Sequence, residues 1–237
     1  MKREVSIAIP IAQMVEPRVL QSMMTLVAYS AQHGIKINYI GITERSLIDD
    51  ARNCLTESFL KSSVEWLFWM DSDMTFPPDT LVKLFNLVET KEAKLATGIY
   101  YQRKGMNYPC IWSRGEETES GEVTGEGDPR SKYNQYLASF AIVHPDKKEP
   151  FKVHSAGFGC VLAHRTVFEM MDRPWFKFIE KTCSEDFYFF VNAKKLGFDL
   201  WAEPTIDLGH IGDAPIITKH DFMKQANKKN IEIEAIK

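Results

Sequence analysis

Apolar positions gather in four short runs over the first hundred residues, and each run has the length of a β-strand. The runs at 5–11 and 66–70 are almost continuously apolar, the run at 35–41 alternates, and the run at 95–101 is again largely apolar. Continuous runs of this length are typical of strands buried on both faces of a sheet. We therefore expect four strands in this part of the chain.

Helical patterns occupy the gaps between these strands. Residues 17–33 repeat apolar positions at helical spacing and are followed by Gly34, a common residue after a helix end. A pattern resembling a capping box at 46–49 predicts a helix to about residue 62, and Pro77–Pro78 predicts the start of another. Strands that alternate with helices predict an α/β fold with a mainly parallel sheet covered on both faces.

The second half of the chain is less regular. Residues 113–150 are rich in Gly, Glu and Ser and contain little periodic apolar structure, which indicates a functional excursion or a mobile segment. Regular patterns then return as strands at 151–155 and 159–163, helices at 166–171 and 184–196, and a peripheral helix after Lys219.

Composition narrows the class of protein. The 237 residues carry a net charge of −3, which gives no overall attraction to nucleic acid or to an anionic membrane. Four scattered cysteines without CxxC spacing favour reduced, packed thiols over a disulfide framework or a zinc site. The apolar run that follows residues 1–4 is too short for the hydrophobic part of a signal sequence, and no run of about 18 apolar residues occurs. We expect a cytoplasmic protein without integral membrane contact.

The most specific local feature is the segment Asp71-Ser72-Asp73, which directly follows the apolar run at 66–70. Residues two apart in extended chain project to the same side, so both carboxylates can face one ligand. Such a pair favours a hard cation, Mg²⁺ or Mn²⁺, with further oxygens from a diphosphate. A turn or helix cap is the simpler interpretation, although the helix at Pro77 begins too late for a cap.

Several short segments together resemble the nucleotide-sugar-dependent glycosyltransferases of the GT-A type, especially family 2. The resemblance spans about residues 4–212 and depends on segments in a fixed order: the strand Val5–Pro10, Asp50-Ala51-Arg52-Asn53, Asp71-Ser72-Asp73, Gly157-Phe158-Gly159, Ser184-Glu185-Asp186, and His210. It implies a Rossmann-like, mainly parallel sheet flanked by helices, with a small antiparallel part on the acceptor side.

The resemblance also implies one glycosyltransferase domain over residues 1–237. Residues 1–101 would form the nucleotide-sugar-binding half and 102–150 an insertion or lid. Residues 151–218 would form the acceptor and catalytic half, and 219–237 a C-terminal tail.

On the donor side, the resemblance places Pro10 beside the nucleotide base and Arg52 near the base or the diphosphate. Asp71 would contact the ribose or the water shell of the metal, with Ser72 in the same donor-binding segment. Asp73 would bind the metal directly. An ordinary exposed helix arginine remains the alternative for Arg52.

His210 matches the third metal ligand of many relatives, and its nitrogen favours Mn²⁺ over Mg²⁺ beside carboxylates. The flanking Gly209 and Gly212 allow close approach of the backbone. A histidine that merely packs in the core or lies at the surface is the alternative.

On the acceptor side, Asp186 is the candidate general base, and Glu185 would orient the acceptor or the base. Acidic residues in the first turn of a helix also simply stabilise it, which is the competing interpretation. Gly157-Phe158-Gly159 would let the acceptor approach the sugar closely. Trp201 is a candidate stacking surface for a sugar ring, although aromatic residues more often fill the core.

The reaction implied is a single in-line displacement with inversion, moving a hexose from a donor that is UDP-linked by default. The absence of a Gln-x-x-Arg-Trp signature and of a membrane helix predicts one sugar per encounter. Acceptors stay open among glycan, lipid-linked sugar, protein and modified nucleobase. A nucleotidyltransferase is an alternative, although residues 10–14 lack its glycine- and arginine-rich loop. A non-catalytic nucleotide-sugar-binding module is another.

Overall fold

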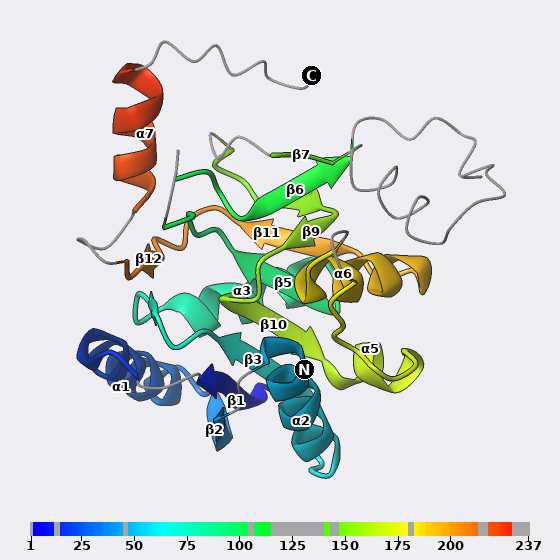
Figure 1. Cartoon of the computed structure of the whole chain (residues 1–237). Coiled ribbons are helices and arrows are strands. Elements are labelled where there is room, and N and C mark those ends of the chain that lie inside the picture. Colours follow the sequence, from blue (N-terminus) through cyan, green and yellow to red (C-terminus); the bar gives the residue numbers. More distant parts are fainter. Residues whose placement is uncertain are drawn as a thin grey trace, which may run out of the picture.

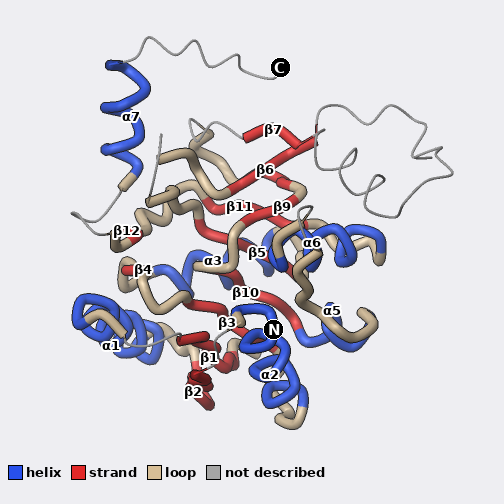
Figure 2. The backbone as a smooth tube through the Cα atoms, in the orientation of Figure 1, coloured by secondary structure: helices blue, strands red, loops and turns tan. Residues whose placement is uncertain are grey.

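A seven-stranded sheet forms the centre of the computed structural model (Figures 1 and 2). The structure describes residues 2–11, 15–44, 47–103, 107–114, 140–142, 147–179, 183–212 and 218–228. The sheet has the order β2-β1-β3-β10-β5-β11-β8. Its strands are β1 (Glu4–Ile11), β2 (Lys36–Glu44), β3 (Trp66–Met70), β5 (Leu95–Gly98), β8 (Phe151–Val153), β10 (Cys160–His164) and β11 (Leu200–Glu203).

Strand directions confirm a mainly parallel sheet. β1, β2, β3, β5 and β11 run in one direction, whereas β10 and β8 run against their neighbours. β10 lies between β3 and β5, so the two halves of the parallel sheet meet on a reversed strand. All five residues of β3 are buried, as its continuous apolar run predicts.

Helices cover both faces of the sheet. The covering helices are α1 (Pro17–Gln32), α2 (Ile48–Leu60), α3 (Thr80–Thr90), α5 (Arg165–Met170) and α6 (Glu185–Lys195), and α7 (Lys219–Lys228) lies apart from the sheet. Leu67 and Trp69 of β3 pack with residues of α2, α5 and α6 in one core cluster. Trp66 and Phe68 of the same strand pack with α1 and α3 in the other. In Figure 1, α1 accordingly lies on the opposite side of the sheet from α2, α5 and α6.

Helix ends follow local sequence in most cases. Gly34 and Gly197 follow the C-caps of α1 and α6 and have φ angles of 74° and 87°, a region that favours glycine. The predicted capping box at 46–49 was wrong, because the N-cap of α2 is Leu47, which makes no side-chain cap hydrogen bond. The fourth strand also ends at Gly98 rather than at 101.

Two small antiparallel sheets complete the structure. β6 (Ile111–Arg114) pairs with β7 (Phe140–Ile142) and with β9 (Ser155–Ala156), which forms the predicted antiparallel part. β12 (Gly209–His210) pairs with β4 (Met74–Thr75), directly after β3. Most of the excursion predicted at 113–150 lies outside the described residues.

All four cysteines are free, and Cys110, Cys160 and Cys183 are buried, in agreement with packed thiols. Burial raises the pKa of the Cys160 thiol to about 12. Among the helices in the described ranges, none combines the length and the apolar character needed to cross a membrane.

Candidate active site

Two groups of charged side chains meet at the end of β3, where the carboxyl ends of parallel strands lie. We call Asp73, Arg103 and His210 the Asp73 corner, and Arg52, Asp71, Glu185 and Asp186 the Arg52 cluster. Asp71 and Asp73 follow β3 directly and are both partly exposed. They turn to different partners, so each belongs to a different group.

The Asp73 corner depends on the pairing of β12 with β4. This pairing sets His210 opposite Met74, and the Ile211 N–H donates to the carbonyl of Asp73 at 2.8 Å. His210 Nδ1 lies 2.6 Å from the carbonyl oxygen of Tyr101. A carbonyl only accepts, so Nδ1 carries the hydrogen, and in a neutral ring Nε2 keeps a lone pair 3.6 Å from Asp73 Oδ2.

This donor set fits a divalent cation. A histidine that ligates a metal through one nitrogen commonly donates from the other to a carbonyl, as His210 does here. Burial alone would raise the pKa of Asp73, but His210, when its ring is protonated and Nε2 donates to the carboxylate, and the charge of Arg103 both lower it. Among the described residues, no group of three or more His, Cys, Asp or Glu side chains is placed to hold a metal ion without other ligands. Asp73 and His210 would therefore need further ligands from a substrate.

Arg103 is a member of this corner that the sequence did not single out. Its Nη1 lies 3.0 Å from Asp73 Oδ2, and its side chain is half exposed. The same nitrogen donates to the carbonyl of Ile211 at 3.4 Å. A cation therefore already neutralises Asp73, and solvent reaches it. Arg103 lies five residues after β5, near the same end of the sheet, and this position could have indicated it as a site residue.

The Arg52 cluster joins α2 to the first turn of α6. Arg52 Nη1 lies 3.0 Å from Glu185 Oε1 and also contacts Asp186, while Nη2 lies 3.1 Å from Asp71 Oδ1. The arginine side chain is only 3% exposed. The alternative of an ordinary exposed helix arginine was therefore wrong.

Burial controls the protonation of this cluster. Burial raises the pKa of Glu185 to about 8, the charge of Asp186 adds to the rise, and Arg52 opposes it. Burial also raises the pKa of Asp71, again against the effect of Arg52. This shift favours the protonated form of Glu185, which can donate a hydrogen bond.

Gly157 and Gly159 make room for Tyr100, a residue that the sequence did not single out. A Cβ on Gly157 would lie 1.9 Å from Tyr100 Oη, and one on Gly159 would lie 3.0 Å from its ring. The Tyr100 ring packs edge-on to His210 with centroids 5.3 Å apart. Phe158 is fully buried among core aromatic rings, so no exposed ring surface is available to an acceptor.

The structure separates Trp201 from these groups. Trp201 pairs with Ala96 of β5 and packs in the cluster on the α1 and α3 side, whereas α2 and α6 cover the other face. Lys91 and Lys152 lie 4.8 and 5.5 Å from its ring centroid. Its predicted place beside the acceptor therefore does not agree with the fold. Pro10 is buried near the end of β1, and Ser72 is half-buried between the two aspartates.

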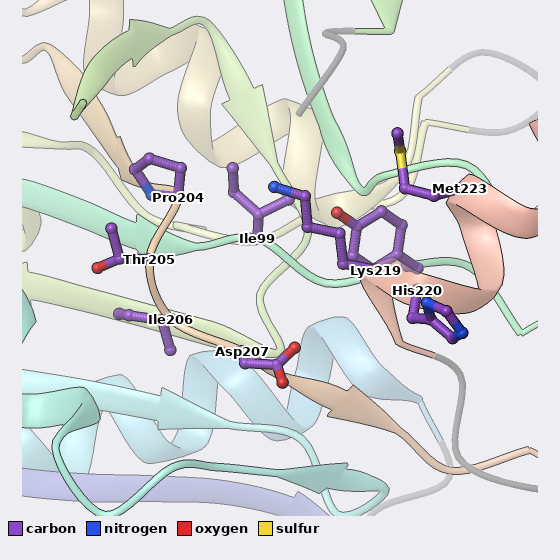
Figure 3. A pocket seen from close by; sticks show the side chains of 9 residues that line it. Ile99, Pro204, Thr205, Ile206, Asp207, Lys219, His220 and Met223 are labelled. Carbon is purple, nitrogen blue, oxygen red and sulfur yellow. The ribbon is translucent and has the colours of Figure 1, made fainter. Parts of the chain in front are cut away.

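A pocket of about 430 Å³ lies next to the Asp73 corner (Figure 3). Lys219, His220 and Met223 of α7 face the segment Pro204–Asp207 across it. Tyr101 also lines this pocket, and its carbonyl holds His210. The sequence predicted the peripheral helix but not the pocket that the helix closes.

Comparisons with known proteins bear on the family and the fold. The family model described as glycosyl transferase family 2 matches residues 26–171, more than half of the chain. A vanadate resistance protein of Candida albicans is 26% identical over 201 residues, which cover 77% of this chain and 43% of that protein. The chain therefore spans less than half the length of this relative.

Two solved structures share the fold. A197 from STIV matches with a TM-score of 0.56 and 20% identity, covering 89% of this chain and 86% of that one. GalNAc-T7, solved with UDP, GalNAc and Mn²⁺, matches with a TM-score of 0.53 and 12% identity, covering 94% of this chain and 47% of that one. At these identities the likeness concerns the fold alone.

Proposed function

We propose, from the premise that this chain belongs to glycosyl transferase family 2, that it moves a hexose from a UDP-linked donor to an acceptor hydroxyl. The transfer would invert the anomeric configuration and require a divalent cation. The observation that carries the proposal is the pair of charged groups at the end of β3, one suited to a cation and diphosphate and the other to a base. Residues 1–101 would bind the nucleotide sugar, and 151–218 would supply the catalytic and acceptor side.

On the donor side, Asp73 and His210 would hold Mn²⁺ or Mg²⁺, and diphosphate oxygens would complete the ligand set. When bound, the cation would supply charge stabilisation to the departing diphosphate. Asp71 would contact the ribose, with Ser72 beside it and Pro10 near the base. Because Arg103 is half exposed, it can leave Asp73 and pair with a diphosphate oxygen.

On the acceptor side, Asp186 would take the proton of the attacking hydroxyl as the new bond forms. Glu185 next to it, whose pKa is raised by burial, would donate a hydrogen bond in its protonated form. Gly157 and Gly159 have no side chains and would let the acceptor approach the backbone closely. Phe158 would support this turn from the core. Trp201 is left out of this proposal.

The separate roles proposed for the two groups suit an inverting transfer. The cation side lies at β12 and β4, and the base side lies at the start of α6. A base on the opposite side of the sugar from the leaving group is the arrangement that a single displacement requires. One sugar per encounter follows from the missing Gln-x-x-Arg-Trp signature.

A screen of nucleotide sugars tests the proposal. The full chain would be mixed with UDP-, GDP- and other nucleotide-linked hexoses, with Mn²⁺ or with EDTA, and its unfolding temperature and the release of nucleoside diphosphate recorded. At least one donor should raise the unfolding temperature and be hydrolysed slowly only when the cation is present. If no nucleotide sugar stabilises the protein, the donor assignment is wrong.

A further inference from the structure

Arg52 is placed so that a donor cannot reach it. Its side chain is 3% exposed, Nη1 and Nη2 both contact carboxylates, and Nε is buried with no hydrogen-bond partner within the described residues. The Phe158 and Phe176 rings lie 5.0 and 5.8 Å from its guanidinium carbon. We propose that Arg52 is a positioning residue that joins Asp71 to Glu185 and Asp186, and that it is not a ligand of the diphosphate.

The neighbouring residue keeps this guanidinium in place. Asn53 donates to the carbonyl of Phe176 at 2.7 Å and accepts from its N–H at 3.1 Å. This double hydrogen bond holds the segment that carries the Phe176 ring against α2. Arg52 thus packs against two adjoining rings, whose positions are set by the core and by Asn53.

One cation serves three acids that belong to distant segments. Arg52 is 19 residues from Asp71, 133 from Glu185 and 134 from Asp186. Carboxylates brought this close in a largely buried place repel one another unless a cation or a proton intervenes. Removing the guanidinium leaves these acids uncompensated, so the first turn of α6 should move away from the end of β3.

The catalytic part of this role rests on the proposed function, which assigns the donor to Asp71 and the acceptor to Asp186. Asp71 would contact the donor and Asp186 the acceptor, so Arg52 fixes the base relative to the donor. Loss of this link should reduce turnover, since a base acts only within hydrogen-bond reach of its proton. Binding of UDP should change much less than turnover, because no phosphate contact is lost and only the ribose contact of Asp71 depends on Arg52.

The first experiment separates turnover from binding in Arg52→Gln. Affinity for UDP with Mn²⁺ is measured by calorimetry, and hydrolysis is measured at saturation with the donor that the screen selects. We expect UDP affinity within about threefold of the unaltered protein, and donor turnover lower by about 10²-fold or more. A tenfold or greater loss of UDP affinity would overturn the proposal, because Arg52 would then contact the nucleotide.

A second experiment needs no nucleotide and so stands apart from the proposed function. Unfolding temperatures are compared for Arg52→Gln, for the double substitution Glu185→Gln with Asp186→Asn, and for all three together. Neutral acids should recover part of the stability that Arg52→Gln loses. Strict additivity would overturn the cluster as a coupled unit. If the unaltered protein binds no UDP while coupling is found, the proposed function fails and the cluster survives.

Arg3→Gln is the matched control for both experiments. Arg3 also pairs with a carboxylate, Glu89, and lies 5.9 Å over the Phe85 ring, but on the α3 side of the sheet. The substitution Arg3→Gln should leave UDP affinity and turnover unchanged. Arg52→Lys replaces Arg52→Gln if the latter is insoluble, since lysine keeps the charge but cannot contact three acids from fixed positions.

Discussion

In both the Asp73 corner and the Arg52 cluster, one arginine pairs with carboxylate side chains. The two groups differ in how firmly that arginine is held. Arg52 is 3% exposed and contacts three acids, whereas Arg103 is 46% exposed and contacts one. A buried cation with three partners cannot be exchanged without unbalancing them. A half-exposed cation with one partner can give way to another cation at little cost. The first group therefore suits a fixed framework, and the second suits a ligand that comes and goes.

The largest effect should come from the Arg52 cluster. Asp186→Asn keeps the size of the side chain but removes its ability to accept a proton, so donor turnover should fall by about 10²–10⁴-fold. Glu169→Gln is the control, because Glu169 is an acid of α5 that pairs with Arg165 outside the site. Unchanged turnover in Asp186→Asn would remove the base assignment and favour a role other than base catalysis for the cluster.

A smaller effect should come from the Asp73 corner. His210→Gln removes Nε2 next to Asp73, so the Mn²⁺ concentration that gives half-maximal stabilisation by UDP should rise about 10–100-fold. The shift is read from unfolding temperatures at constant UDP. His33→Gln is the matched control, since His33 is exposed and stacks on Tyr29. An unchanged Mn²⁺ requirement would show that the cation has no ligand at His210.

Local sequence predicts the elements of this fold better than their partners. The apolar run at 66–70 and the helical spacing at 17–33 each determine one element, and β3 and α1 follow them closely. The direction of β10 could not be predicted in this way, because its short apolar run fits a buried strand of either direction. Its direction depends on its pairing with β3 and β5, which local sequence does not reveal.

The same limit applies to the site. Asp73 and His210 could be inferred because each follows a short, recognisable segment, and β4 and β12 bring them together. The partners of Arg52 could not, because two of them lie more than 130 residues away. Tyr100 was missed for a related reason. Its importance depends on what Gly157 would otherwise contact, which sequence spacing does not reveal.

The turn that lies between the two groups offers a further test. Gly157→Ala would place a Cβ 1.9 Å from Tyr100 Oη, so it should lower the free energy of unfolding by about 1–3 kcal/mol. Tyr100→Phe removes that oxygen, and the double variant should recover part of the loss. Denaturant unfolding measures both. If Gly157→Ala alone is as stable as the unaltered protein, Tyr100 does not fill this space.

A dependence of stability on pH should come from Glu185 of the Arg52 cluster. The pKa of Glu185 is raised to about 8 by burial and by Asp186, so the folded state keeps a proton that the unfolded chain releases at about pH 4.3. The folded state therefore binds more protons between these values, and stability should fall as pH rises through them. The contribution is at most about 1.4 kcal/mol per pH unit and is complete below the lower value. Glu185→Gln should flatten this slope between about pH 5 and 8, measured by denaturant unfolding, whereas Glu169→Gln should not. A slope that is the same in Glu185→Gln and the unaltered protein would mean that Glu185 is ionised in the folded state.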